Sequence, residues 1–142
     1  MALKTTIAAA LAAVTLGMFA GSAAEAKTRV VIGVGNVGKA VLRRARAFGV
    51  KLLGNDIVDI APDFLVEYGV EMTSLEDLLQ RSDYISVNCT LNQSSRHLIN
   101  AETLSYLRPN AVLINTSRGP VVDEPALVEA LSQERLRGAA LD

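Results

Sequence analysis

The chain is poor in several residue types, and each scarcity argues against a class of site. A single Cys excludes an internal disulfide, and one His beside one Cys argues against a zinc site. Trp is absent and aromatic residues make up only 4% of the chain, so no base-stacking platform is expected. The formal net charge of −1 gives no overall field that would attract nucleic acid or an anionic membrane. The sequence therefore predicts neither a nucleic-acid partner nor a bound metal.

The amino terminus has the composition of a secretory leader. Lys4 is the only charged residue before Glu25, and residues 7–20 are an uncharged run rich in Ala, Leu and Val. Ala24 and Ala26 then give the small-x-small pattern of a signal-peptidase site. We therefore expect a signal peptide over residues 1–26, and a protein that is exported or periplasmic if this leader is cleaved.

Two other interpretations of this segment stay open. It is compatible with an Ala-rich helix packed on the domain, or with a weak membrane anchor. Its Ala, Gly, Ser and Thr content makes it only marginally apolar, so no stable membrane span is expected once the leader is removed. The remaining residues, 27–142, suffice for one domain of ordinary size.

A glycine motif follows the first apolar segment of this domain. Residues 29–34 predict a buried strand that leads into Gly33-x-Gly35-x-x-Gly38, and a helix pattern follows. Asp56 closes the next apolar segment, 18 residues after Gly38. Gly33 permits a tight turn, Gly35 lets the backbone approach a pyrophosphate, and Gly38 lets the helix lie close to the strand. Together with the positive end of the helix dipole, this order of parts predicts a dinucleotide site.

The rest of the chain alternates between helix and strand patterns. The first helix, 37–48, is expected to turn one face inward, formed by Val37, Val41, Ala45 and Phe48. Further helices are predicted over 62–68, from Ser74 through 80, over 101–107 and after an Asp123 cap. Strands are predicted over 50–56, 70–72, 84–89, 111–116 and, cut short, over 138–142. This alternation indicates an α/β fold of the Rossmann type, a doubly wound parallel sheet with helices on both faces.

Polar residues gather where these strands end. In a doubly wound sheet, ligands bind at the carboxyl ends of the strands, near the point where the strand order reverses. Five segments fall at such ends, namely 33–38, Asp56, 88–90, 116–118 and Asp142. We therefore expect them to meet in one crevice.

Asp56 and Arg118 carry the chemistry of this predicted crevice. A carboxylate at the end of the second strand accepts both ribose hydroxyls and repels a 2′-phosphate, and Ile57 and Val58 provide no Arg for one. That favours NAD over NADP, with a strand-end Asp that caps a turn as the alternative. Arg118 follows a buried strand and suits bidentate pairing with a carboxylate, with a surface ion pair as the alternative.

Several long segments, in this order, resemble a known family. They are 33–38, 48–56, 95–100, 114–124 and 138–142. They are similar to the NAD-binding lobe of the D-isomer-specific 2-hydroxyacid dehydrogenases, which include phosphoglycerate dehydrogenases and glyoxylate/hydroxypyruvate reductases. The likeness covers about residues 27–142.

The resemblance implies NAD as cofactor and a set of contacts to it. The implied contacts come from the glycine turn together with Asn36, Val37, Asp56, Cys89, Thr116, Ser117 and Asp142. Arg118 matches the arginine that binds the carboxylate and carbonyl oxygen of a 2-oxo acid. The implied function is hydride transfer between NAD(H) and a 2-hydroxy or 2-oxo acid in the cytoplasm. A homodimer is one assembly that stays open.

The sequence also departs from the family pattern. The family's proton-carrying His and its Glu partner lie beyond the equivalent of Asp142, and most of the substrate lobe precedes the glycine motif. Asn88-Cys89-Thr90 stands where the family reads His-x-Pro, and His97 matches a non-catalytic position. We therefore expect a truncated lobe that is not active alone. A non-catalytic NAD-binding or dimerisation module, and a truncated or fused gene fragment, are the alternatives.

Overall fold

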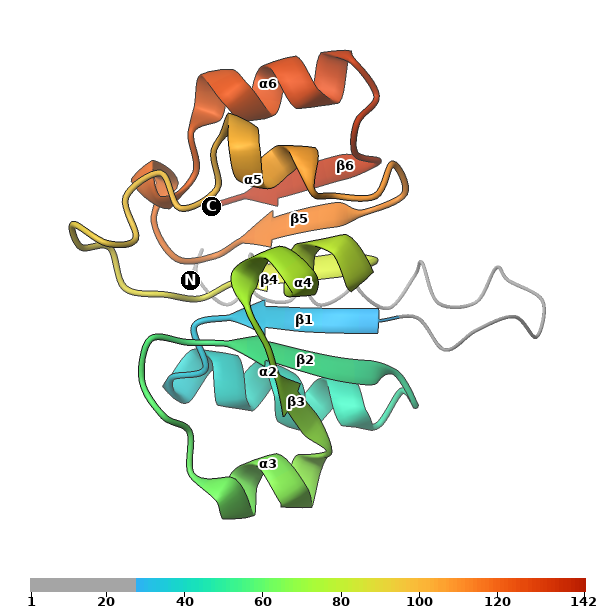
Figure 1. Cartoon of the computed structure of the whole chain (residues 1–142), viewed down its shortest axis with the longest axis vertical. Coiled ribbons are helices and arrows are strands. Elements are labelled where there is room, and N and C mark those ends of the chain that lie inside the picture. Colours follow the sequence, from blue (N-terminus) through green and yellow to red (C-terminus); the bar gives the residue numbers. More distant parts are fainter. Residues whose placement is uncertain (1–27) are drawn as a thin grey trace, which may run out of the picture.

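A parallel β-sheet forms the centre of the molecule (Figure 1). The computed structural model describes residues 28–142. The strands are β1 (Thr28–Ile32), β2 (Lys51–Asn55), β3 (Val70–Met72), β4 (Tyr84–Val87), β5 (Val112–Asn115) and β6 (Gly138–Leu141). They pair in the order β3-β2-β1-β4-β5-β6, and every pairing is parallel. This is the strand order of the Rossmann fold, so the predicted doubly wound sheet is confirmed.

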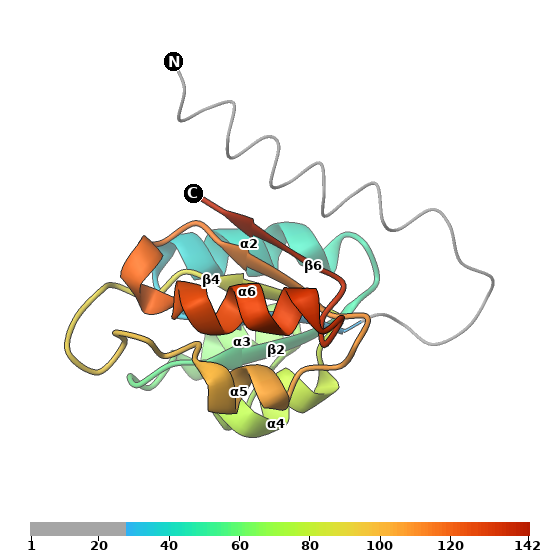
Figure 2. The ribbon, with the colours of Figure 1, turned by 90° about the horizontal axis from the view of Figure 1, so that it is seen from above.

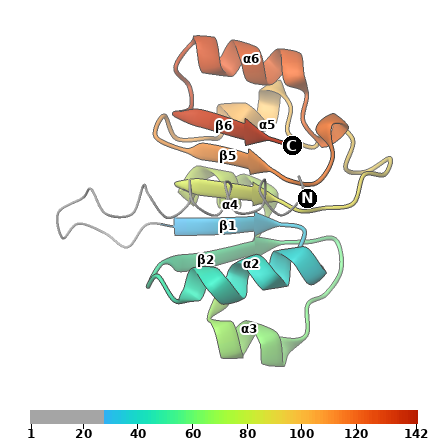
Figure 3. The same cartoon turned by 180° about the vertical axis from the view of Figure 1, so that it is seen from behind.

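Helices cover both faces of the sheet. They are α2 (Asn36–Arg46), α3 (Pro62–Tyr68), α4 (Leu75–Arg81), α5 (Ala101–Ser105), the 3-10 turn η1 (Gly119–Val121) and α6 (Glu124–Ser132). Figure 2 shows α2 on one side of the sheet and α4 and α5 on the other. Seen from behind, α2 lies in front of β2 and beside β1 (Figure 3). The core contacts place α3 with α2, and α6 with α4 and α5.

The central strand β1 is buried on both faces. Val30 and Ile32 belong to the apolar cluster under α4, α5 and α6, whereas Val31 belongs to the cluster under α2 and α3. All three are at most 2% exposed. Because successive side chains of a strand point to opposite faces, a strand covered on both sides needs an uninterrupted apolar run. The covered part of β1, residues 30–32, therefore carries no polar side chain.

Two helix starts follow the caps that the sequence predicts. The Asp123 carboxylate accepts the Ala126 N–H (3.2 Å) at the start of α6. The Ser74 hydroxyl accepts the Asp77 N–H (3.2 Å) at the start of α4. Each cap satisfies an amide that has no partner inside its helix.

The predicted element boundaries agree with the structure to within about two residues. The helix over 62–68 and the strand over 70–72 are found at the predicted residues. β1 ends at Ile32, two residues early, because Gly33 (φ +85°) turns the chain out of the sheet. β4 ends at Val87, two residues before the predicted end, because Val87 pairs with Ile32 and β1 offers no partner beyond it.

The inward face predicted for the first helix was wrong in part. Of the four side chains that the prediction named, Ala45 is buried and Val41 is partly buried against the same cluster. Val37 is instead 59% exposed and Phe48 42% exposed, and Gly38 and Leu42 are buried in α2. The reason is the contact of Gly38 with Gly33: a Cβ on Gly38 would lie 2.0 Å from the Gly33 carbonyl oxygen. This close approach turns Gly38 toward the sheet, and residues four and seven positions later follow it.

The predicted leader, residues 1–26, lies outside the described residues. None of the helices within 28–142 combines the length and the apolar character that a bilayer crossing requires. Within the same range, no three His, Cys, Asp or Glu side chains come together as a metal site would need.

The packing of α2 can be tested by truncating its buried Leu. Leu42→Ala removes a fully buried side chain, so we expect it to lower the free energy of unfolding by about 2–5 kcal/mol. Val128→Ala, at a position that is 64% exposed on α6, is the matched control and should change that free energy by less than about 0.5 kcal/mol. Equilibrium urea unfolding measures both variants. Equal midpoints for the two would contradict the packing described for α2.

Candidate functional site

The turn after β1 holds its three glycines under different constraints. Gly33 adopts a positive φ, and a Cβ there would lie 2.5 Å from the Cys89 backbone nitrogen. Gly38 has no room for a Cβ either, because of the Gly33 carbonyl. A Cβ on Gly35 would meet nothing within 4 Å. Gly33 and Gly38 are therefore required by the fold, whereas the space beside Gly35 is free for a ligand.

The amino-terminal end of α2 opens on the same space. Gly35 is its N-cap residue, no side chain caps the helix, and no acidic residue lies in its first turn. Asn36 and Val37 are both exposed. The first amides of this 11-residue helix are therefore left for an anion, which the helix dipole also favours.

Asp56 directly follows β2 and reaches back to the glycine turn. Its Oδ2 accepts the Val34 N–H (2.6 Å), and its Oδ1 accepts the Val58 N–H (3.1 Å). The turn-capping alternative is thus seen in the structure. These two hydrogen bonds leave acceptor sites of Asp56 unused, because an ionised carboxylate has about four of them. Two sites remain for hydroxyl donors, on a carboxylate that two amides already hold in place.

One pocket joins the ends of β1, β2 and β4. It has a volume of about 270 Å³, and its lining includes Gly33, Gly35, Asp56 and Cys89 from the predicted set. Residues 55–58 and 88–90 line it as well. The pocket therefore lies where β1 and β4 adjoin, which is the point where the strand order reverses.

Cys89 behaves as a small apolar residue of this pocket. Burial raises the pKa of its thiol above the usual range, and the nearby Asp56 carboxylate adds to the rise. The thiol is therefore protonated at neutral pH, and a protonated thiol is a poor nucleophile.

The loop that carries Arg118 is shaped by Asn115, which sequence analysis did not single out. Asn115 is 1% exposed; its Oδ1 accepts the Ser117 N–H (3.0 Å) and hydroxyl (2.6 Å). Its Nδ2 donates to the Arg118 carbonyl (2.9 Å). An Asn at a strand end followed by Thr-Ser is a signal for such an Asx turn. This turn fixes the backbone from which Arg118 projects.

The Arg118 guanidinium is exposed and lightly held. Its Nη1 donates to the Ser117 carbonyl (2.7 Å), and it forms no ion pair with any residue in 28–142. The surface ion pair considered as an alternative is therefore not formed in this part of the chain. Its remaining donors are suited to a carboxylate.

The predicted site residues fall into two groups. The 270 Å³ pocket is lined by Gly33, Gly35, Asp56 and Cys89, whereas Asn36, Val37 and Gly38, which follow Gly35 on α2, do not line it. Thr116 adjoins this group through a hydrogen bond of its hydroxyl to Asn88 Oδ1 (3.4 Å). Ser117, Arg118 and Asp142 lie at the ends of β5 and β6, where the Asp142 N–H donates to the Asn115 carbonyl (3.1 Å).

Comparison with known proteins accounts for this arrangement. Residues 8–142 match the model of the D-isomer specific 2-hydroxyacid dehydrogenase, NAD binding domain. The chain belongs to this family. The match begins within the segment for which a leader is predicted, and that leader stays a prediction. NAD is therefore the cofactor of the domain, and the open Gly35, the uncapped α2 amides and the Asp56 carboxylate fit it.

Its relatives include several oxidoreductases. Glyoxylate reductase from Thermococcus litoralis is 40% identical over 125 residues, which are 88% of this chain and 38% of that enzyme. The apo structure of D-lactate dehydrogenase from Escherichia coli matches with a TM-score of 0.79 at 36% identity, over 82% of this chain and 37% of that one. The NAD complexed form of a D-isomer specific 2-hydroxyacid dehydrogenase from Lactobacillus delbrueckii ssp. bulgaricus gives 0.77 at 34% identity, over 82% and 34%. The chain thus spans little more than a third of the length of these family members.

His97, the only histidine of the chain, does not line the pocket of this NAD-binding domain, whereas Ser95 and Leu98 beside it do. It is exposed, has a positive φ of 51°, and its N–H donates to the carbonyl of Pro120 (2.9 Å), two residues after Arg118. The non-catalytic role expected from the sequence stays a prediction.

Two glycine substitutions should separate folding from NAD binding. Gly35→Ala places a methyl group in open space, so the melting temperature should be nearly unchanged while NAD affinity falls about tenfold or more. Gly38→Ala clashes with the Gly33 carbonyl and should lower the free energy of unfolding by more than about 2 kcal/mol. Thermal unfolding and calorimetric titration with NAD measure the two effects. Equal loss of stability in both variants would contradict the geometry of the turn.

Proposed function

We propose that this chain is the NAD-binding lobe of an oxidoreductase that moves hydride between NAD(H) and a 2-hydroxy or 2-oxo acid. The observation that carries the proposal is the pocket where Asp56, the glycine turn and the uncapped start of α2 meet. The relatives named for glyoxylate and D-lactate support the substrate class, since these are a 2-oxo acid and a 2-hydroxy acid.

In this proposal, residues at different strand ends bind different parts of NAD. The amides of Asn36 and Val37 bind the diphosphate, and Asp56 binds the adenosine ribose. Thr116 and Asp142 line the groove toward the nicotinamide, as the family resemblance implies. Bound NAD(H) supplies the hydride chemistry.

Arg118 is the proposed substrate contact. Its exposed guanidinium pairs with the carboxylate of the 2-oxo acid and stabilises negative charge that develops on the carbonyl oxygen. Asn115 and Ser117 support this role because they fix the Arg118 backbone.

Arg118 is not itself the proton carrier of the proposed reaction. The reaction needs an acid or base within hydrogen-bond reach of the substrate oxygen. The resemblance places the family's proton-carrying His and its Glu partner beyond the equivalent of Asp142, and the chain spans 38% of the glyoxylate reductase that it resembles. We therefore propose that this chain does not turn over substrate by itself.

Cofactor choice is the direct test of the role of Asp56. NAD should bind at least about tenfold more tightly than NADP, because the carboxylate repels the 2′-phosphate. Asp56→Asn removes the charge and keeps an acceptor for the Val34 N–H. The ratio of NAD affinity to NADP affinity should therefore fall while the fold is retained. Asp56→Ala should in addition lower the free energy of unfolding by about 1–3 kcal/mol, because the Val34 amide loses its partner. An unchanged preference in Asp56→Asn would show that this carboxylate does not meet the ribose.

Turnover is the second test. The purified chain with NADH and glyoxylate or hydroxypyruvate should show no steady NADH oxidation above that of Arg118→Ala, the matched control. Clear turnover that Arg118→Ala abolishes would refute the claim of inactivity and support the Arg118 role.

Dimerisation that depends on NAD, seen by analytical ultracentrifugation without turnover, would favour the non-catalytic module. The exposed residues of β6, including Leu141 at 49%, offer an edge for such a homodimer.

A further inference from the structure

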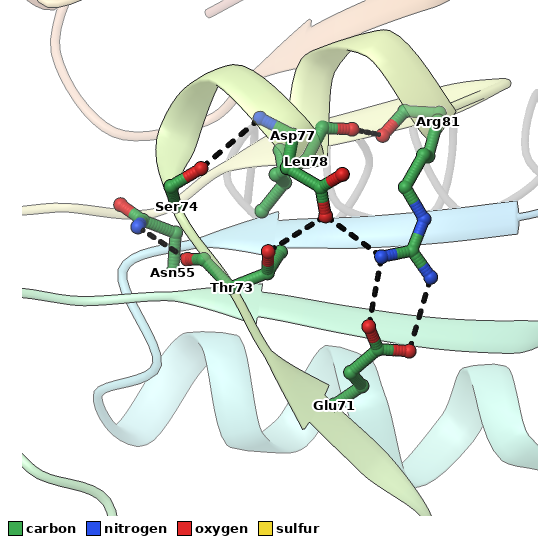
Figure 4. Close-up of polar contacts among 8 residues, drawn as sticks. Asn55, Glu71, Thr73, Ser74, Asp77, Leu78 and Arg81 are labelled. Atoms are coloured by element: carbon green, nitrogen blue, oxygen red, sulfur yellow. Dashed lines mark hydrogen bonds and ion pairs between the residues drawn. The ribbon is translucent and has the colours of Figure 1, made fainter.

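Thr73, the residue that follows β3, joins the ends of three elements (Figure 4). Its N–H donates to the Gly54 carbonyl of β2 (3.0 Å). Its carbonyl accepts a hydrogen bond from the Asn55 Nδ2 (2.8 Å), and its hydroxyl donates to Asp77 Oδ2 on α4 (2.7 Å). All three polar groups of Thr73 are therefore engaged.

Arg81 links Asp77, the acceptor of the Thr73 hydroxyl, to Glu71 of β3. Arg81 Nη1 lies 2.7 Å from Asp77 Oδ2, and the Arg81 guanidinium donates to both oxygens of Glu71 (2.8 and 3.0 Å). Hydrogen bonds from Thr73 and from Arg81 hold the pKa of Asp77 below its usual value, and the Arg81 hydrogen bond does the same for Glu71. Both carboxylates are therefore ionised acceptors at neutral pH.

Asn55 connects the network to the cofactor pocket. It is the last residue of β2, and its carbonyl accepts the Gly33 N–H (2.9 Å). The next residue, Asp56, accepts the Val34 N–H. Asn55 and Asp56 both line the pocket, whereas Thr73 does not. A polar path therefore runs from α4 through Thr73 to the carboxylate proposed for the ribose.

Packing supports β3 and α3 but not the loop after Asp56. Val70 of the edge strand β3 and Phe64 of α3 are buried in the cluster under α2, and Met72 packs against it. In the loop after Asp56, Ile57 is 83% and Val58 64% exposed. A segment with so few buried apolar contacts is expected to open locally unless polar bonds hold it.

We propose that Thr73 is a positioning residue for Asp56, fixing through Asn55 the end of β2 from which Asp56 meets the adenosine ribose. The proposal rests on the NAD site described above and assigns Thr73 no contact with the cofactor. The ion pairs of Arg81 with Glu71 and Asp77 lie at the surface, where 36–57% of each side chain is exposed. They therefore contribute little to the free energy of unfolding. Loss of the Thr73 hydroxyl is expected to affect ribose recognition more than folding.

The test compares two ligands that differ at one ribose hydroxyl. The probes are NADH and the NADH analogue that lacks the 2′-hydroxyl of the adenosine ribose, titrated by fluorescence against the full chain. The ratio of their dissociation constants reports how well Asp56 is placed, independently of the fraction of folded protein. We expect the wild type to favour NADH about tenfold, as for a hydrogen bond to a charged group.

The variants separate positioning from stability. Thr73→Val removes the hydroxyl and should reduce the ratio about threefold or more, and Thr73→Ser, which keeps the hydroxyl, should restore it. Gln80→Ala is the matched control: it removes a hydrogen bond to Glu76 on the same helix (3.1 Å) and should leave the ratio unchanged. Arg81→Gln is the second variant if Thr73→Val does not fold, and it should shift the ratio in the same direction.

The measured ratios and affinities test the positioning role of Thr73 and the proposed function separately. A wild-type ratio in Thr73→Val, even with a lower melting temperature, would overturn the positioning role and leave the NAD site intact. If Thr73→Val does not fold, a wild-type ratio in Arg81→Gln would overturn it. Equal affinity of the wild type for both probes would remove the ribose role of Asp56. No NADH binding by the folded wild type would overturn the proposed function and the positioning role together.

Discussion

The close approach of α2 to the end of β1 sets the geometry of the whole site. It requires that Gly38 carry no side chain, because a Cβ would lie 2.0 Å from the Gly33 carbonyl oxygen. With Gly38 against the strand, Leu42 and Ala45 are buried, and Gly35, the N-cap of α2, lines the pocket. One backbone contact thus determines both the core under α2 and the position of its uncapped end.

The two-sided burial of the sheet explains where polar chemistry is found. Strand interiors such as Val30 and Val31 lie between two layers of helices, so no ligand group reaches them. Beside these buried strands the strand ends are open, and there Asp56 supports the turn and is the proposed contact to the ribose. It holds the Val34 and Val58 amides and keeps acceptor sites free. Substitutions of this carboxylate therefore alter the turn as well as cofactor choice.

Sequence analysis predicted the sheet, the glycine turn and Asp56, because these follow from local patterns and short spacings. It misassigned the buried face of α2, since Val37 and Phe48 are strongly apolar and the Gly38 contact that rotates the helix is tertiary. It also missed Asn55, whose partner Thr73 lies 18 positions away in the loop after β3. A hydrogen bond between a strand end and a distant loop leaves no periodicity in the sequence, so only the fold reveals it.

An Asn side chain at a strand end supports each of the two groups of site residues. Asn55 is the last residue of β2 and Asn115 the last of β5. Each donates its side-chain amide to a backbone carbonyl of a following loop, Thr73 at 2.8 Å and Arg118 at 2.9 Å. Because an Asn amide both donates and accepts, it ties a loop to a strand end where ladder bonds stop. Asn115 therefore fixes the loop that presents Arg118, whereas Asn55 ties the end of β2, next to Asp56, to the loop after β3.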